Sequence, residues 1–227
     1  METIFTPDIL QMMLDIRLNN NKQFMQEHKA EYVAKMRDPY YRLIELLAPA
    51  MRDIDPKMEV RPYKALSRIF RDTRFSHNKA PYRDHHWVAF RHEGEPREGS
   101  VVFWFEIHLD SVNWGFGFWG ENRKAMDMLR RRITANPDEL LGLLPILTKH
   151  HFSLEGAKYR RLDLPEGLPK ALEPWYKSRE LYLIRRNVDP KWVFEPDFHQ
   201  RLIKDFTSLA PFYRLLRGCY ELAAIEE

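Results

Sequence analysis

The chain has 227 residues, of which 44% are hydrophobic and 13% aromatic, so it can bury a substantial core and is not a disordered chain. Its formal net charge of +3 is too small to indicate a dedicated nucleic-acid-binding protein. One cysteine, Cys219, excludes an internal disulfide, and neither a signal-peptide pattern nor an apolar run of membrane-spanning length is present. These features predict a soluble, cytoplasmic protein with no membrane partner.

Residues 1–55 predict helices. Thr6, Pro7 and Asp8 are typical of a helix start, because they offer a hydroxyl cap, a proline at the first helical position and an acid near the positive end of the helix dipole. Apolar side chains then recur at helical spacing in three runs, and the asparagines at 19–21 are suited to cap the second. Asp55 and Pro56 end the third run. We find no catalytic constellation in this region.

Residues 85–90 and 101–119 predict strands, because apolar and polar residues alternate there. Asp110 and Ser111 reverse the chain, so residues 101–119 predict an antiparallel hairpin rich in aromatic side chains. One face of its first strand is apolar and belongs to the core. The opposite face carries Trp104, Glu106 and His108.

Helical spacing returns after residue 120, strands are expected near 152–154 and 180–186, and Pro196 opens the final helices. No repeat or linker marks a domain boundary. We therefore expect one α+β domain over residues 1–227, helical in 1–55, with a mixed sheet and a basic loop in 56–120, and with helices and strands in 121–227. Its antiparallel sheet, with the aromatic hairpin at the centre, is flanked by N-terminal and C-terminal helices.

The most unusual feature of the sequence is the basic stretch, which we define as residues 61–83. It carries a local charge of +6, twice that of the whole chain, because one acid, Asp72, stands among seven basic residues: Arg61, Lys64, Arg68, Arg71, Arg74, Lys79 and Arg83. Arginines concentrated among turn residues are typical of sites that hold carboxylates or phosphates. The basic stretch therefore predicts a site for an anion.

We predict that this site binds an anionic or phosphorylated small molecule, with seven ligand-binding residues: Arg68, Arg71, Arg74, Lys79, Arg83, Trp104 and Trp119. Glu106 and His108 are two residues apart on one strand face, so they are candidates for a catalytic acid and base. Glycines at 115 and 117 are expected to leave room for the ligand against the sheet.

The sequence predicts no cofactor and no metal. It contains no phosphate-binding glycine loop, no nucleophile elbow and no zinc-binding helix motif. His85 and His86 point to opposite faces of a strand and cannot chelate one ion together. A metal site would require Glu106 and His108 to converge with a distant residue.

Residues 68–83 read RIFRDTRFSHNKAPYR, and this string resembles the signature of a mainly bacterial family of conserved hypothetical proteins, domain-of-unknown-function family two-four-six-one. Two further features resemble the family, the asparagines at 19–21 followed by Phe24 and the glycines at 115 and 117 followed by Trp119. Asn78 departs from the pattern, because an acid is common there. The resemblance covers nearly the whole chain and implies a shared fold and site, but no activity.

Two other functions stay open. In the first, the arginines form an internal network of salt bridges, such as Arg71 with Asp72 and Arg83 with Asp84, in a structural protein or one that binds an acidic partner. In the second, the basic stretch and the arginines at 130–132 and 160–161 contact nucleic acid. The sequence does not define the oligomeric state.

Overall fold

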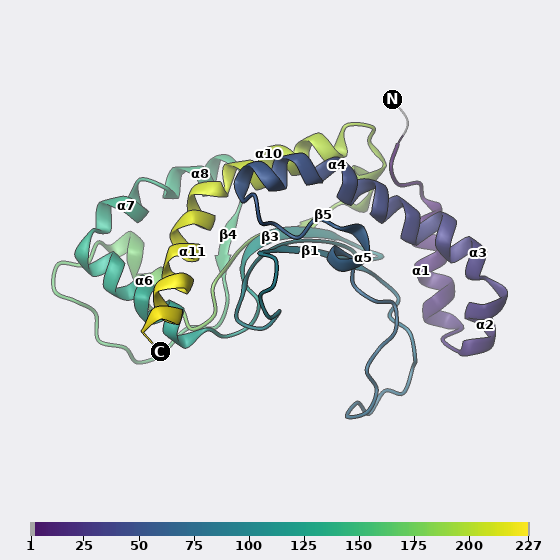
Figure 1. The fold of residues 1–227 in the computed structure, drawn as a ribbon, viewed down its shortest axis with the longest axis horizontal. Coiled ribbons are helices and arrows are strands. Elements are labelled where there is room, and N and C mark those ends of the chain that lie inside the picture. The colour runs from purple at the N-terminus through teal and green to yellow at the C-terminus, as the bar shows by residue number, and fades with distance from the viewer. Residues whose placement is uncertain (1–2, 227) are drawn as a thin grey trace. The chain divides into compact units, whose positions relative to one another are not determined.

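The computed structural model describes residues 3–226, and within them the strands form one five-stranded antiparallel sheet in the order β1-β2-β3-β5-β4 (Figure 1). The strands are β1 (Trp87–Arg91), β2 (Val101–Ile107), β3 (Val112–Phe118), β4 (Ser153–Glu155) and β5 (Tyr182–Val188). Helices precede and follow the sheet in the chain. The predicted α+β class and the hairpin of β2 and β3 at its centre are confirmed.

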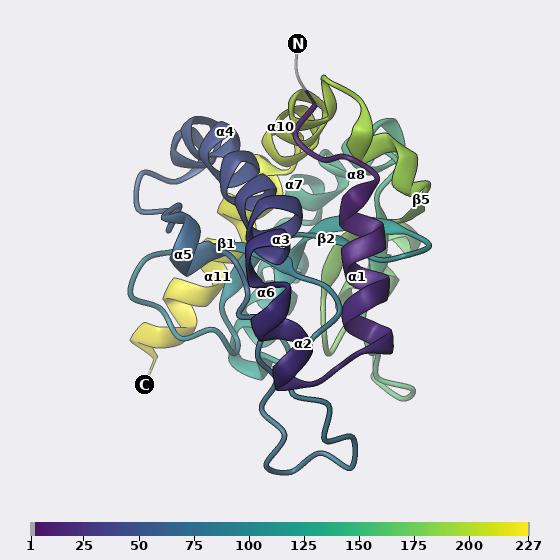
Figure 2. The same ribbon diagram turned by 90° about the vertical axis from the view of Figure 1, so that its right-hand side faces the viewer.

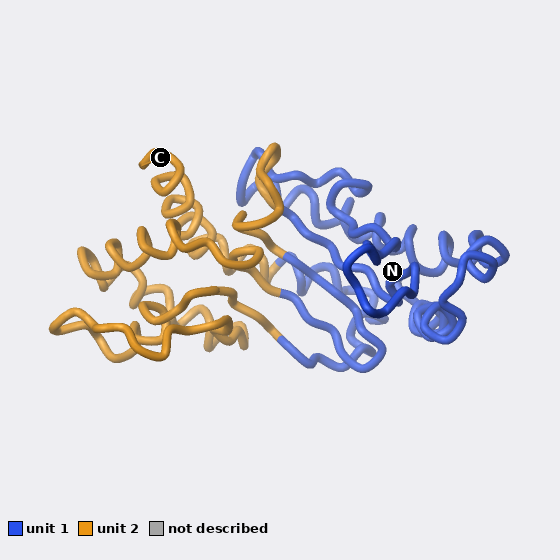
Figure 3. The backbone as a smooth tube through the Cα atoms, turned by 90° about the horizontal axis from the view of Figure 1, so that it is seen from below, with its two compact units in different colours: residues 1–90, 104–114, 186–203 blue, residues 91–103, 115–185, 204–227 orange. Residues whose placement is uncertain are grey.

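The described residues divide into two compact units (Figure 3). The first unit contains the chain up to residue 90, together with 104–114 and 186–203, and the second contains 91–103, 115–185 and the chain from 204 onward. Strands β1, β2, β3 and β5 each contribute residues to both units.

The helices of the first unit come mainly from the N-terminal quarter of the chain: α1 (Asp8–Leu18), α2 (Lys22–Glu27), α3 (Lys29–Tyr32), the π-helical turn η1 (Val33–Arg37), α4 (Asp38–Ile54) and α5 (Pro62–Ala65). Figure 2 shows α1 beside the column formed by α3, η1 and α4, and α1 packs against η1. The 3-10 turn η3 (Pro190–Phe194) and the start of α10 (Phe198–Ser208) complete the unit.

The predicted helix caps agree with the structure in part. The side chain of Asn21 accepts a hydrogen bond from the backbone N–H of Phe24, which confirms an asparagine cap for α2. The predicted cap of the first helix is wrong. Helix α1 begins at Asp8 with Pro7 as its cap residue, and the Thr6 hydroxyl donates to the carboxylate of Asp8 at 3.1 Å instead of accepting from the helix.

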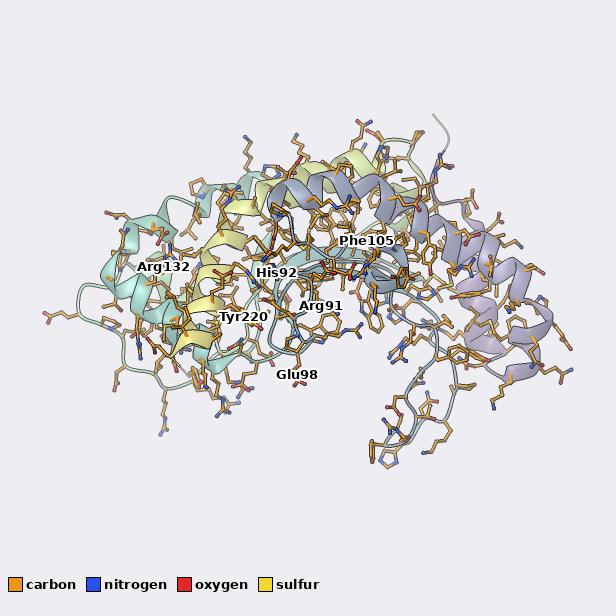
Figure 4. All side chains as sticks on the ribbon, viewed as in Figure 1. Arg91, His92, Glu98, Phe105, Arg132 and Tyr220 are labelled. Atoms are coloured by element: carbon orange, nitrogen blue, oxygen red, sulfur yellow. The ribbon has the colours of Figure 1, made fainter. Side chains whose placement is uncertain are left out.

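The core of the first unit is aromatic. Phe105 of β2 (labelled in Figure 4) contacts the rings of Phe5, Tyr40 and Phe198, which come from the N-terminal segment, α4 and α10. All four side chains are fully buried. The apolar face predicted for this strand is therefore the face that packs against the helices.

The segment between α5 and β1, residues 66–86, contains neither a helix nor a strand and leaves the sheet as a long loop (Figures 1 and 2). We call it the connecting loop. Isolated bridges join Leu66 to Val88 and Phe70 to Tyr82, so the base of the loop contains single pairings instead of a strand.

The second unit contains α6 (Arg123–Ala135), α7 (Pro137–Leu141), α8 (Leu144–Lys149), η2 (Lys170–Leu172), α9 (Glu173–Tyr176) and α11 (Ala210–Ile225). Helix α11 packs against α6, and its Tyr213 stacks on Phe103 of β2. Cys219 is buried in α11, and burial raises the pKa of its thiol to about 11. None of the helices within residues 3–226 combines the length and hydropathy needed to cross a lipid bilayer.

His86 is a buried polar residue that links three parts of the first unit. Its ring nitrogens lie 2.8 Å from the hydroxyl of Tyr32 in α3 and 3.1 Å from the hydroxyl of Ser67 in the connecting loop. Its carbonyl accepts a hydrogen bond from the Tyr40 hydroxyl of α4 at 3.1 Å. Burial disfavours the charged imidazole and lowers the pKa of His86 to about 4.

We expect the free energy of unfolding to fall by about 2 kcal/mol between about pH 6.5 and about pH 5, because the unfolded chain protonates His86 in this window and the folded chain does not. The pKa of His108 is raised in the folded chain. Its contribution to stability is complete below the pKa of His108 in the unfolded chain and is lost only as the pH rises above that value. His108 therefore does not add to the fall in stability between about pH 6.5 and about pH 5. Urea unfolding across this range measures the slope.

The slope should flatten in His86→Gln and persist in His77→Gln, which replaces an exposed histidine of the connecting loop. Equal slopes in the wild-type protein and His86→Gln would show that His86 is not the titrating group.

Candidate functional site

The first unit contains a polar cavity of about 360 Å³ at the base of the connecting loop, which we call the arginine cavity. It is lined by Arg17, Asn20, Arg71, Asn78, Ala80, Tyr82, Arg83, Asp84 and His85. Most of these residues belong to the loop, and Arg17 and Asn20 come from the end of α1 and the turn that follows it.

Backbone hydrogen bonds close the base of the loop. The N–H of Arg71 donates to the carbonyl of Pro81 at 2.9 Å, and the N–H of Arg83 donates to the carbonyl of Ile69 at 2.7 Å. The amide of Asn20 then pairs with the backbone of Tyr82 twice, donating to its carbonyl at 3.0 Å and accepting from its N–H at 2.9 Å. These bonds fix the backbone on both sides of the cavity.

Arg83 is the most unusual residue of the cavity. Its guanidinium lies 4.7 Å from the centre of the Trp87 ring, and its Nε is buried with no hydrogen-bond partner. Burial and then the charges of Arg71 and Arg68 lower the pKa of Arg83. Among residues 3–226, no carboxylate forms an ion pair with Arg83 or with Arg71. The positive charge of this wall is therefore not neutralised by the protein.

Three other basic residues predicted to bind the ligand do not line the cavity. Arg74 forms a two-fold hydrogen bond with the carboxylate of Asp72 at 3.0 and 2.8 Å, and its side chain is 77% exposed. The charged hydrogen bond from Arg74 lowers the pKa of Asp72 to about 2. Lys79 donates to the carbonyl of Thr73 at 3.0 Å, and Arg68 is exposed and acts on Arg83 through its charge alone.

The two predicted tryptophans are also outside the cavity. Trp104 is half-buried in β2, and Trp119 belongs to the second unit, where Arg97 lies 5.4 Å from its ring centre. The space predicted beside Gly117 is filled by the protein itself, because a β-carbon there would lie 2.4 Å from the carbonyl oxygen of Leu181. The interpretation of that glycine as room for a ligand is therefore wrong, and it serves close packing against β5.

Asp84 connects the arginine cavity to the sheet. Its carboxylate accepts a hydrogen bond from Arg17 Nε at 2.6 Å and one from His85 Nδ1 at 2.8 Å. Burial raises the pKa of Asp84, but the hydrogen bonds from His85 and Arg17 together lower it more, so the group stays ionised. Because a carboxylate only accepts, Nδ1 of His85 carries the proton in this contact, and in the neutral imidazole Nε2 then keeps its lone pair.

Glu106 and His108 lie together on the polar face of the hairpin, as predicted. His108 Nε2 is 3.2 Å from a carboxylate oxygen of Glu106, and Asn113 of β3 donates to the same oxygen at 3.4 Å. The hydrogen bond with Glu106 raises the pKa of His108. Burial raises the pKa of Glu106, while His108, His85 and Asn113 lower it, with a net decrease.

His85 brings this pair next to the arginine cavity. The rings of His85 and His108 are 4.6 Å apart, whereas Glu106 and His108 themselves do not line the cavity. No binding or catalytic role was predicted for Arg17, Asn20, Asp84 or His85. The alternation of strand residues was the signal for His85, since it places His85 on the face opposite His86, where Glu106 and His108 also lie.

The fold and this site define an α+β protein whose arginine-lined cavity adjoins a cluster of imidazoles and a carboxylate. The chain belongs to the family described as conserved hypothetical protein (DUF2461), whose sequence profile matches residues 8–215. This confirms the resemblance drawn from residues 68–83, and the matched range contains every residue of the cavity and of the cluster. A search of curated proteins gave no match.

Asn20 is expected to hold the connecting loop closed. In Asn20→Ala both hydrogen bonds to the backbone of Tyr82 are lost, at a cost of about 1–3 kcal/mol, so the amide of Tyr82 should exchange with solvent at least about 10-fold faster. Hydrogen exchange resolved at this amide measures the effect. Asn19→Ala is the matched control, because Asn19 bonds within α1 to the carbonyl of Asp15. Unchanged exchange in Asn20→Ala would show that Asn20 does not hold the loop.

Proposed function

We propose that the arginine cavity binds a small anionic molecule through a phosphate or carboxylate group, with Arg83 and Arg71 as its main ligands. One observation carries the proposal: Arg83 is half-buried, its buried Nε has no hydrogen-bond partner, and no carboxylate within residues 3–226 pairs with its guanidinium. A buried donor left without an acceptor costs about 1–3 kcal/mol. An anion in the cavity would supply this acceptor and would offset the repulsion between Arg83 and Arg71.

The chemistry of the wall suits oxyanions. A guanidinium presents several N–H donors in a planar fork that matches two oxygens of a carboxylate or phosphate. Asn20 and His85 add polar groups at the same cavity, while Arg17 is neutralised by Asp84. A volume of about 360 Å³ lies within the range of small-molecule sites and favours a metabolite over a polymer.

The alternative of an internal salt-bridge network has less support. It predicted pairs of Arg71 with Asp72 and of Arg83 with Asp84. Instead, Asp72 pairs with Arg74, and Asp84 pairs with Arg17 and His85. Of the three arginines that line the cavity, Arg17 pairs with Asp84, whereas Arg71 and Arg83 have no acidic partner among residues 3–226.

The nucleic-acid alternative also has less support. Of the arginines assigned to it, Arg130 donates to the carbonyls of Tyr176 and Ser178, Arg131 pairs with Glu226, and Arg132 pairs with Glu139. These contacts within the protein occupy donors of three of the five arginines that this alternative adds to the basic stretch.

The catalytic role predicted for Glu106 and His108 stays a prediction. The two side chains pair with each other, and His85 is the member of their group that faces the cavity. We therefore propose binding without assigning a reaction.

A panel of phosphate, sulfate, sugar phosphates, nucleoside monophosphates and dicarboxylates tests this proposal by thermal shift. A ligand at about 100 times its dissociation constant adds about 2.7 kcal/mol, which raises the melting temperature of a chain of this size by roughly 5–11 °C. Calorimetric titration of the best compound then compares variants. Arg83→Gln and Arg71→Gln should each weaken binding by about 10–100-fold, the worth of a charged hydrogen bond.

Arg74→Gln is the matched control, since it removes one positive charge from the same loop but from outside the cavity. Equal weakening in all three variants would indicate a general electrostatic effect and contradict the proposed site. A panel in which no compound shifts the melting temperature would also contradict it.

A further inference from the structure

A second cluster of functional side chains lies on the polar face of the sheet beside the arginine cavity. His85 precedes β1, Glu106 is in β2, and His108 directly follows β2. One ligand-type atom from each of the three residues lies within 4.8 Å of the other two. The pairing of neighbouring strands β1 and β2 thus gathers two imidazoles and one carboxylate that are separated in the chain.

The distances are close to those around a bound metal ion. Ligand atoms at about 2.1 Å from a tetrahedral ion are about 3.4 Å apart. His108 Nε2 and the nearest oxygen of Glu106 are already 3.2 Å apart. The ligand atom of His85 lies within 4.8 Å of both, and the side chains are 26–29% exposed, so an ion can reach them from solvent.

Two of the three ligands are oriented by a second layer of hydrogen bonds. Asp84 accepts from Nδ1 of His85 at 2.8 Å, and Arg17 holds Asp84 in turn at 2.6 Å. This leaves Nε2 of His85 with a free lone pair, in the carboxylate–histidine arrangement common at metal sites. Asn113 donates to Glu106 at 3.4 Å, and its own oxygen accepts from the N–H of Asn187 at 2.9 Å.

We propose that His85, Glu106 and His108 form a binding site for a divalent transition-metal ion, with Zn²⁺ as the best fit to the ligands. Two imidazoles and one carboxylate suit borderline ions of the first transition row, whereas Mg²⁺ and Ca²⁺ prefer oxygen ligands throughout. Three protein ligands leave at least one coordination position for water or for another molecule.

The site does not depend on the proposed anion binding. Its three ligands are positioned by the sheet and by Asp84. None of them is an arginine, and none is supplied by an anion in the cavity. Metal binding is therefore measured in a buffer without phosphate, and its outcome is separate from that of the anion panel.

The test is a calorimetric titration of the protein, purified without a histidine tag and treated with chelator, with Zn²⁺, Mn²⁺, Mg²⁺ and Ca²⁺. We expect one Zn²⁺ per chain, weaker Mn²⁺ binding, and no saturable binding of Mg²⁺ or Ca²⁺. Glu106→Gln and His108→Asn should each weaken Zn²⁺ binding by more than about 100-fold, because changes to the second layer alone cost about 10–100-fold. Asp84→Asn should fall in that lower range.

The matched control is His151→Asn. His151 is an exposed histidine outside the cluster, and its φ of 58° is a conformation that asparagine accepts, so the variant removes an imidazole without strain. Circular dichroism and melting without metal show whether each variant folds. Co²⁺ bound in place of Zn²⁺ gives visible absorption whose intensity reports four-coordination, and these bands should disappear in His85→Asn and persist in His151→Asn.

Two results would overturn the proposal. The first is the absence of saturable Zn²⁺ binding by the folded wild-type chain. The second is equal affinity in the wild-type chain, Glu106→Gln and His108→Asn, which would mean that the ion binds to scattered surface histidines.

Discussion

The burial of His86 is the constraint on which the first unit and its candidate site both depend. Its neutral ring joins α3 through Tyr32 and the connecting loop through Ser67, and its carbonyl binds Tyr40 of α4. Successive residues of extended chain point to opposite faces, so an inward His86 requires an outward His85. The polar network that stabilises the core thus also sets the direction of the histidine shared by the cavity and the cluster.

Local signals were enough to predict most of the fold. The alternation in residues 101–119 gave the hairpin and its buried face, and the spacing of apolar residues gave the long helices α4, α6 and α11. The structure of the connecting loop was harder to predict, because it is held by hydrogen bonds between residues that are distant in the chain. Asn20 and Tyr82 are 62 positions apart, and no periodic pattern records such a pair.

The same limit applies to the candidate site, where the sequence did not predict which charged residues pair with each other. Composition placed the predicted anion site on the basic stretch, but it could not say which arginine keeps its charge unpaired. Arg74 looked as suitable as Arg83, yet Arg74 lies two residues from Asp72 and the two pair locally. Arg83 is next to Asp84, but Asp84 is occupied by Arg17 from the end of α1. The fold decides which opposite charges pair, and in the arginine cavity it leaves Arg83 and Arg71 without an acidic partner among the described residues.

Asp84 is the residue through which the two proposed sites are coupled. It neutralises Arg17, which removes one cation from the arginine cavity, and its contact with Nδ1 orients His85, a member of the cluster. An anion held by Arg83 and a cation held by His85, Glu106 and His108 would therefore be neighbours, and each would reduce the electrostatic cost of the other. A metal ion held by His85, Glu106 and His108 would supply Lewis-acid chemistry beside the proposed anion site. Thermodynamic linkage requires that the metal and the anion change each other's affinity by the same factor. If each strengthens the binding of the other, the two sites act as one.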